Sequence, residues 1–470
     1  MDYSAILRIL ETLRRGPRPE DSPAPAESII PEINGIPNFR GKPATLGMDK
    51  WLRTLGYPNI DLDIVHVAGT KGKGATCAYT ECLLRQHGQR TGYPKKTGLY
   101  TSPHLCDVRE RIRINFEPLS EEKFTEYVSY VYTALGVSNL GANAPRYLQF
   151  LALVSFHVFI QENVDVAIYE THQGGEYDAT NIIRKPLVTA ITTIDRDHMH
   201  QLGPTLQHVA WHKAGIFKRG ATAFSAPQQS ELASVLHARA DKEGAPLSFV
   251  DVYDTDVPAG APIPEPKVQL LNFSLACAIS NEVLRKTRRV VLSPQDRRQA
   301  IETFSWPGRF QKISHSNVTW FLDGAHNELS LDVCAEWFAN ASFTVDPNNS
   351  ISRILIFSHF STHRDSAKLL GALAHYLSRH GMSMQHALFV PCHYSSSPSN
   401  DIQLPLLDLY GEPWGAVFPG SCVQKCATSA EAMDSVWKLR GEKIHVLVTG
   451  SLHLVGDIIN QLDRGVQLKE

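Results

Sequence analysis

The sequence lacks several features that would mark a membrane or nucleic-acid-binding protein. It contains no apolar run of membrane-spanning length. Its formal net charge is only −2 over 470 residues, so there is no bulk electrostatic attraction to nucleic acid or to an anionic membrane. The basic run at residues 285–289 is most simply a solvated helix face, with a nucleic-acid patch as the alternative. We therefore expect neither nucleic acid nor membrane among the partners.

Cysteine spacing also excludes some classes of protein. The eight cysteines form no CxxC pair, and Cys422 and Cys426 have no second pair or ligand cluster nearby that would indicate zinc. Free thiols are typical of a reducing compartment. The first residues show neither an apolar signal core nor an arginine-rich transit pattern. We expect a cytoplasmic protein, and the sequence leaves a mitochondrial form open.

What the sequence does contain is the length for two domains and an alternation of apolar patterns. Its 43% hydrophobic residues are ordinary for a globular protein. Strand-like segments alternate with helical ones, from residues 62–67 to residues 444–449, which predicts parallel βαβ units and a doubly wound α/β sheet. We place an N-terminal domain at residues 1–299 and a smaller C-terminal domain at residues 300–470. The proline-rich residues 16–43 are expected to be an extended surface segment.

A glycine-rich stretch at residues 67–77 follows the first strand and precedes a helix that we expect to end at Gly88. Its glycines let backbone N–H groups approach an anion, and the helix N-terminus adds partial positive charge. Lys73 would supply an ammonium to the β- and γ-phosphates of a nucleotide. Because the first glycine stands one residue too close for the general P-loop pattern, and Ala75 replaces a hydroxyl, a purely structural turn is the alternative for this stretch alone.

Polar side chains follow other expected strands. Lys73, Ser102, Glu170 and His198 all come just past predicted strand ends. Ligands of parallel sheets bind beyond the carboxyl ends of the strands, so these residues could converge on one edge. Taken alone, a histidine near a strand end is usually structural. The alternating charged and apolar residues at 108–115 predict a half-exposed strand.

An ordered set of motifs is more specific than any one of them. It runs HVAGTKGKGAT, TGLYTSPHL with RERIRIN, GGEYDATNII, DH at residues 197–198, AWHKAGIFK, WPGRFQ, LDGAHN and VLVTGSLHLVG. This set resembles the folylpolyglutamate and dihydrofolate synthase family of the ATP-dependent Mur ligase superfamily, and its eukaryotic, fungal branch most of all. The resemblance spans roughly residues 5–462.

The resemblance implies a P-loop-type ATPase domain with a central, mostly parallel sheet, followed by a smaller Rossmann-like α/β domain. It also implies amide ligation. The γ-phosphoryl group of ATP would pass to a substrate carboxylate, and the amine of L-glutamate would attack the acyl phosphate. The acceptor would be the γ-carboxylate of a folate. The resemblance further implies Mg²⁺, a monovalent cation such as K⁺ as a further candidate, and a monomer.

The resemblance assigns roles to individual residues. It places the nucleotide against Gly69, Thr70, Lys71, Gly72, Lys73, Gly74, Ala75, Thr76, Asn272, Arg309, Asp323 and His326. It maps the metal ligands onto Ser102, Glu170 and His198, and the catalytic residues onto Lys73, Lys213, Arg309 and His326. These residue types suit the chemistry, because phosphoryl transfer needs positioning and charge neutralisation, and Mg²⁺ prefers oxygen ligands.

Lys213 and Arg309 each have a plainer interpretation. Lys213 lies in an apolar setting, from which a lysine can also extend its ammonium to the surface. By resemblance, Lys213 instead carries a carbamate that serves as a ligand for a second metal. Arg309 would contact phosphate across the cleft between the domains, or it could form an ordinary salt bridge in the linker.

The sequence departs from the family pattern near Glu170. The family continues Val-Gly-x-Gly-Gly after that glutamate, whereas residues 171–175 read Thr-His-Gln-Gly-Gly, so His172 replaces a glycine. Asp195 stands where the family commonly has glycine. All the charged catalytic positions remain, so we expect an active folate ligase. The departures keep open a paralogous ligase for a non-folate carboxylic acid, or an inactive nucleotide-binding homologue.

Overall fold

The chain forms two compact units. The computed structural model describes residues 1–14, 32–33, 36–37, 43–196, 198–252, 256–343, 351–360, 365–391, 404, 407–439 and 443–467. The first unit comprises Met1–His104 and Arg109–Phe304, and the second comprises Leu105–Val108 and Ser305–Glu470. The main division therefore falls after Phe304, a few residues beyond the boundary expected after residue 299. The short excursion Leu105–Val108 was not expected.

The first unit is built on an eight-stranded sheet with the strand order β10-β9-β8-β3-β7-β4-β5-β6. Its strands are β3 (Ile64–Ala68), β4 (Thr97–Tyr100), β5 (Ile112–Ile114), β6 (Glu117–Pro118), β7 (Val166–Glu170), β8 (Val188–Ile191), β9 (Thr222–Ser225) and β10 (Leu247–Phe249). All neighbours pair in parallel except β4 with β5 and β5 with β6. The prediction of a mostly parallel sheet is confirmed.

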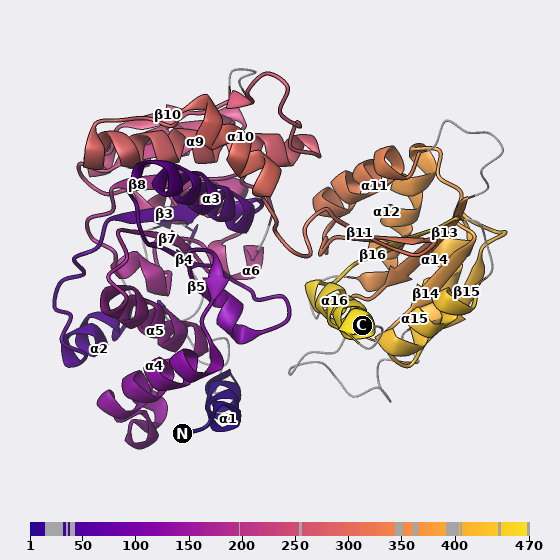
Figure 1. The fold of residues 1–470 in the computed structure, drawn as a ribbon, viewed down its shortest axis with the longest axis horizontal. Coiled ribbons are helices and arrows are strands. Elements are labelled where there is room, and N and C mark those ends of the chain that lie inside the picture. Colours follow the sequence, from indigo (N-terminus) through magenta and orange to yellow (C-terminus); the bar gives the residue numbers. More distant parts are fainter. Residues whose placement is uncertain are drawn as a thin grey trace. The chain divides into compact units, whose positions relative to one another are not determined.

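Helices cover both faces of this sheet. Every residue of β3, β4 and β7 is buried, which explains why their sequences are almost continuously apolar. Helices α3 (Lys73–Thr91) and α9 (Lys267–Arg288) lie on one face, and α5 (Tyr147–Gln161) lies on the other (Figure 1). Neighbouring residues of β4 show this division. Thr97 donates a hydrogen bond to Glu81 of α3, whereas Gly98 lies against Phe159 of α5.

The remaining elements of this unit are shorter. The helices are α1 (Tyr3–Arg14), α2 (Met48–Thr54), α4 (Glu121–Ala134), α6 (Met199–Leu202), α7 (Leu206–Lys213), α8 (Ser230–Glu243) and α10 (Pro294–Thr303). Short 3-10 turns occur at Val108–Arg111, Ala179–Ile182 and Ala214–Ile216, among others. The pair β1 (Glu32–Ile33) and β2 (Ile36–Pro37) is antiparallel, and the rest of the proline-rich segment up to residue 42 lies outside the described residues.

Two local predictions were wrong. Helix α3 continues past Gly88 to Thr91 and is capped by Gly92, whose φ is 87°. Gly88 is required for a different reason, since a Cβ there would lie 1.9 Å from the carbonyl oxygen of Pro94. The expected strand at residues 108–115 is a 3-10 turn followed by the short strand β5. Val108–Arg111 forms the 3-10 turn, so pairing with β4 begins only at Ile112.

The second unit contains a six-stranded sheet with the order β11-β12-β16-β13-β14-β15. Its strands are β11 (Gln311–His315), β12 (Val318–Leu322), β13 (Ile351–Phe357), β14 (His386–Phe389), β15 (Cys422–Lys425) and β16 (Lys443–Thr449). Only β11 is antiparallel to its neighbour. Its helices are α11 (Glu328–Ser342), α12 (Ser366–Arg379), α14 (Asp408–Gly415), α15 (Ser429–Lys438) and α16 (Leu452–Gln467).

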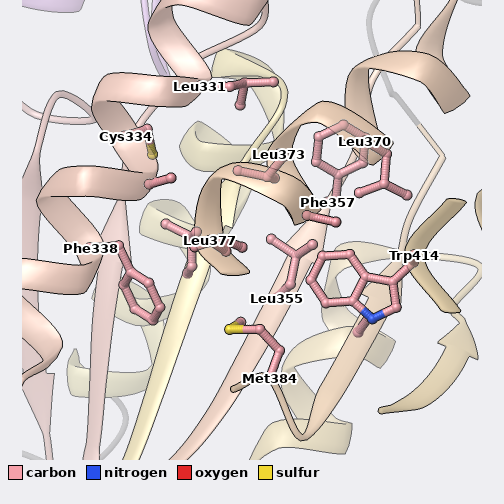
Figure 2. Packing of buried hydrophobic residues seen from close by; sticks show 14 of the residues in the cluster. Leu331, Cys334, Phe338, Leu355, Phe357, Leu370, Leu373, Leu377, Met384 and Trp414 are labelled. Carbon is pink, nitrogen blue, oxygen red and sulfur yellow. The ribbon is translucent and has the colours of Figure 1, made fainter. Parts of the chain in front are cut away.

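The second sheet has a hydrophobic core on each face. Residues of α11, α12 and α14 pack on one face, where Figure 2 shows Phe338, Leu373 and Trp414 gathered around Leu355 and its neighbours. Residues of α15 and α16 pack on the other face. Helices on both sides of a nearly parallel sheet form the doubly wound, Rossmann-like arrangement that was expected.

The described part of the chain shows two further features. Its cysteines are all free, as their spacing predicted. No helix there combines the length and the apolar character needed to cross a bilayer.

Candidate functional site

The glycine-rich segment connects the buried strand β3 to helix α3, as predicted. The backbone N–H groups of Thr70 and Lys71 both donate to the carbonyl oxygen of Thr193, at 2.9 and 3.2 Å. The hydroxyl of Thr70 also bonds to the backbone of Asp195. These bonds hold the loop against the chain that follows β8. The first N–H groups of α3 have no acceptor within the helix, so together with the helix dipole they form a site suited to an anion.

Gly72 allows a close contact between this loop and helix α9. It precedes α3 with a φ of 86°, and a Cβ there would lie only 2.3 Å from Oδ1 of Asn272. Asn272 is held in place because its amide donates to Gln269 at 3.0 Å and its oxygen accepts from the hydroxyl of Thr76 at 3.4 Å. Asn272 therefore does lie beside the loop. The hydroxyl of Thr76 is directed to Asn272.

Three predicted site residues meet where β4 and β7 end. Oε2 of the buried Glu170 accepts the backbone N–H of Ser102 at 2.9 Å. Oε1 of Glu170 lies 4.0 Å from Nζ of Lys73. Because β4 and β7 are parallel neighbours, their carboxyl ends lie side by side, as the sequence predicted. A carboxylate and an ammonium that meet at the start of α3 are suited to a divalent cation bound to phosphate.

Lys213 is directed into the loop and does not extend to the surface. Only 3% of this residue is exposed at the end of α7, and its Nζ donates to the carbonyl oxygen of Gly69 at 2.6 Å. Burial of an ammonium is costly unless polar groups compensate it. A lysine in this position can affect a bound phosphate either through its charge or after modification.

The predicted metal ligands are only partly brought together. His198 is exposed at the start of α6 and has a left-handed φ of 51°. Its neighbour Asp197 lies outside the described residues. In the part of the chain that the structure describes, no group of three or more His, Cys, Asp and Glu side chains could hold a metal ion. The set of Ser102, Glu170 and His198 therefore stays a prediction, and the first two are the members in contact.

The predicted nucleotide residues of the second unit lie together around the loop after β12. Asp323 accepts the backbone N–H groups of Phe310 at 3.0 Å and of Ala325 at 2.9 Å. Nδ1 of His326 bonds to the carbonyl oxygen of Gly324 at 2.9 Å, so this nitrogen carries a hydrogen. The guanidinium of Arg309 lies against Gly324, where a Cβ would be 2.5 Å from Nη1. Their contact with a nucleotide bound by the first unit stays a prediction.

A further group of polar side chains was not predicted from the sequence. Nε2 of His172 lies 2.7 Å from the hydroxyl of Tyr100, and Nδ1 lies 3.3 Å from Oδ1 of Asp178. The other carboxylate oxygen of Asp178 accepts the backbone N–H groups of His172 and Gln173, at 2.9 and 2.8 Å. His172 was noticed as a departure from the family pattern, but nothing in the sequence indicated its partners.

These side chains continue into the sheet. Oδ1 of Asp178 accepts the hydroxyl of Thr180 at 2.7 Å, and the oxygen of Thr180 lies 2.8 Å from Nε2 of His66 on β3. Burial lowers the pKa of His66 to about 3, so its imidazole is neutral. Burial alone would raise the pKa of Asp178, but the neighbouring His172 and several hydrogen bonds hold that pKa below its usual range. Asp178 is therefore a carboxylate that several donors surround.

Comparisons with known proteins agree on one family. No family model matches the chain. The folylpolyglutamate synthase of Neurospora crassa is 36% identical over 453 residues, which covers 89% of this chain and 85% of that protein. The mitochondrial folylpolyglutamate synthase of Homo sapiens is 36% identical over 372 residues, which covers 73% of this chain and 60% of that protein.

Solved structures of other proteins share the fold of this chain. The apo form of L. casei FPGS matches with a TM-score of 0.74 at 22% identity, covering 98% of this chain and 100% of that one. A structure described as an FPGS-AMPPCP-folate complex matches with a TM-score of 0.70 at 21% identity and the same coverage. At this level of identity the structural likeness establishes the fold of the chain.

Proposed function

This chain belongs to the folylpolyglutamate synthase family, and we propose that it is an ATP-dependent ligase that adds L-glutamate to the γ-carboxylate of a folate. The reaction proceeds through an acyl phosphate and releases ADP and phosphate. The observation that carries the proposal is the meeting of Lys73, Glu170 and Ser102 at the start of α3. The names of the relatives support folate as the acceptor, and the contacts of Lys73 and Glu170 support a site for the phosphates of ATP at the start of α3.

The residues of the first unit bind and orient the phosphates. Backbone N–H groups at the start of α3 donate hydrogen bonds to phosphate oxygens. Lys73 neutralises charge that develops as the γ-phosphoryl group is transferred. Asn272 fixes the shape of the loop through its contacts with Gly72 and Thr76. In this proposal Arg309, Asp323 and His326 engage the nucleotide from the second unit.

The donor set suits a divalent cation. Glu170 offers a buried carboxylate whose Oε2 accepts the backbone N–H of Ser102, and we assign the Ser102 hydroxyl as a second ligand. These are the oxygen ligands that Mg²⁺ prefers, and we assign His198 as the third ligand. Mg²⁺ bound there would neutralise phosphate charge. Glu170 also lies 4.0 Å from Lys73, so the carboxylate holds the lysine ammonium near the same position.

Lys213 is assigned a carbamate in this proposal. Its burial and its contact with the carbonyl oxygen of Gly69 place it at the phosphate loop. A carbamate would convert the ammonium into an anionic ligand for a second cation. The amine of Lys213 would have to lose its proton before it reacts with CO₂. We add K⁺ as a candidate monovalent cation.

The departures at His172 and Asp195 keep a second candidate function in view. A ligase that uses the same acyl-phosphate chemistry on a non-folate acid would retain the arrangement of Lys73 and Glu170. The ring of His172 is engaged by Tyr100 and Asp178, so its presence does not by itself argue for a silent homologue.

The remaining assignments concern the setting of the enzyme. We propose a monomer that acts on small molecules in the cytoplasm, without nucleic acid or membrane as a partner. The human and bovine relatives are named as mitochondrial proteins, so a mitochondrial form remains open.

A substrate panel with ADP release as the readout separates these functions. Release with tetrahydrofolate and L-glutamate, dependent on both, supports the folate ligase. Release only with another carboxylic acid supports the second candidate. Tight ATP binding without turnover on any acid would leave only a nucleotide-binding homologue. The same panel with Lys73→Ala controls for a contaminating ATPase.

A further inference from the structure

His172 occupies a position between two strand ends that carry predicted metal ligands. Glu170 ends β7, and Ser102 lies shortly after the end of β4. Tyr100 ends β4 and pairs with Tyr169 in the sheet. The side chain of His172 therefore folds back from the loop after β7 to reach the hydroxyl of Tyr100 at 2.7 Å.

Two ties consequently cross from β4 to the end of β7. One is the hydrogen bond from the backbone N–H of Ser102 to Glu170. The other is the bond between the side chains of Tyr100 and His172. The sheet ladder ends at the pair of Tyr100 and Tyr169, and these two bonds join the chain segments at and beyond that pair. Their combined effect is to limit how far Ser102 can move from Glu170.

The hydrogen bond between Tyr100 and His172 is supported by the buried carboxylate of Asp178. Only 5% of the His172 side chain and 2% of the Asp178 side chain are exposed. Asp178 also accepts the backbone N–H groups of His172 and Gln173, so ring and backbone are fixed by one carboxylate. The carboxylate favours a hydrogen on Nδ1 of His172, which leaves Nε2 to accept the hydroxyl hydrogen of Tyr100.

We propose that His172 and Tyr100 are positioning residues that set the spacing of Ser102 and Glu170 and thereby the affinity of the site for a divalent cation. The inference rests on the proposed function for the identity of that cation. A glycine at position 172 would leave the loop after Glu170 without a side-chain tie to β4. This chain thus has a support for the carboxylate that a glycine cannot provide.

The test compares two tyrosine variants that each remove one hydroxyl. Tyr100→Phe deletes the bond to His172 and retains the ring that packs on Tyr169. Tyr57→Phe is the matched control, because the hydroxyl of Tyr57 lies 2.7 Å from Nδ1 of His157 on α5, in the same unit. The readout is the Mg²⁺ concentration at which binding of AMPPCP is half-maximal, measured by titration calorimetry.

Tyr100→Phe should raise this Mg²⁺ concentration about two- to tenfold, the range expected for the loss of one hydrogen bond, while Tyr57→Phe leaves it unchanged. His172→Gly should raise it at least as much, and His172→Gln, whose amide can still bond to Tyr100, should recover part of the loss. In turnover, the Mg²⁺ requirement should shift while the KM for the acid acceptor stays constant.

The inference is overturned if Tyr100→Phe and His172→Gly leave the Mg²⁺ requirement at the value of the unaltered chain, or if Tyr57→Phe shifts it equally. It is separable from the proposed function. Should the unaltered chain ligate no acid at all, the proposed function fails, and the binding titration still decides whether His172 and Tyr100 position the cation site.

Discussion

Replacing Gly72 by alanine should damage the candidate site for a reason that a second glycine of the same helix can isolate. Gly72 and Gly92 stand at the two ends of α3 with φ values of 86° and 87°. An alanine at Gly92 meets nothing within 4 Å, whereas one at Gly72 meets Oδ1 of Asn272 at 2.3 Å. The two variants therefore share the backbone cost and differ in one contact.

The magnitudes follow from these contacts. A left-handed backbone costs an alanine about 1–2 kcal/mol, and this is the whole cost expected for Gly92→Ala. Gly72→Ala must also displace Asn272, which weakens its hydrogen bonds to Thr76 and Gln269. At about 0.5–1.5 kcal/mol for each bond, Gly72→Ala should be the less stable variant by about 1–3 kcal/mol.

Denaturation of both variants by urea measures the difference in unfolding free energy. The affinity for AMPPCP measures the effect on nucleotide binding. Gly72→Ala should bind AMPPCP at least about tenfold more weakly, because the backbone N–H groups that donate to phosphate oxygens are displaced. Gly92→Ala should bind AMPPCP normally. The double variant Gly72→Ala with Asn272→Ala should be more stable than the sum of the single effects predicts, since the clash is gone. Equal destabilisation and equal AMPPCP affinity in the two glycine variants would refute the reasoning.

Three further predictions concern charged or titrating side chains. Lys73→Ala should lower turnover about 100- to 1,000-fold, and Arg309→Ala should lower turnover more than ATP affinity, as steady-state kinetics would show; near-normal turnover removes the residue from the site. Lys213→Arg should be nearly inactive, and bicarbonate should restore activity that the unaltered enzyme loses on CO₂ removal; an active Lys213→Arg enzyme indifferent to bicarbonate contradicts the carbamate. Burial lowers the pKa of His157 to about 4, so the unfolded chain takes up a proton near the ordinary value of about 6.5 and the folded chain does not. The unfolding free energy should therefore fall as the pH drops from about 6.5 to about 4, and fall less in His157→Phe when urea curves at the two pH values are compared; an identical fall in both proteins would contradict this account.

Patterns local to the chain predicted most elements well. The strands expected at residues 62–67 and 444–449 are β3 and β16, whose bounds differ by at most two residues, because a mostly apolar segment determines each of them. Gly88 was wrongly predicted to end the helix. A glycine is needed there because the backbone of Pro94 packs against α3 and leaves no room for a Cβ atom. The sequence does not distinguish a glycine that ends a helix from a glycine that allows another backbone segment to pack closely against the helix.

The same distinction applies to the site. Lys73, Ser102, Glu170 and His198 were predicted to converge, since the carboxyl ends of parallel strands share one edge. The first three meet, whereas His198 is exposed at the start of α6. The contact of Gly72 with Asn272 depends on how α9 packs against α3, and no spacing in the sequence reveals it. The partners of His172 were hidden for the same reason, since they depend on the path of the loop after β7.

Oxygen transfer from the acid acceptor to phosphate tests the central claim most directly. If the γ-carboxylate of a folate attacks the γ-phosphoryl group and glutamate then displaces phosphate, one carboxylate oxygen must leave with the phosphate. With acceptor labelled by ¹⁸O in that carboxylate, mass spectrometry should find one labelled oxygen in the inorganic phosphate for each amide formed. Amide formation with unlabelled phosphate, or ADP release without amide, would contradict an acyl-phosphate ligase.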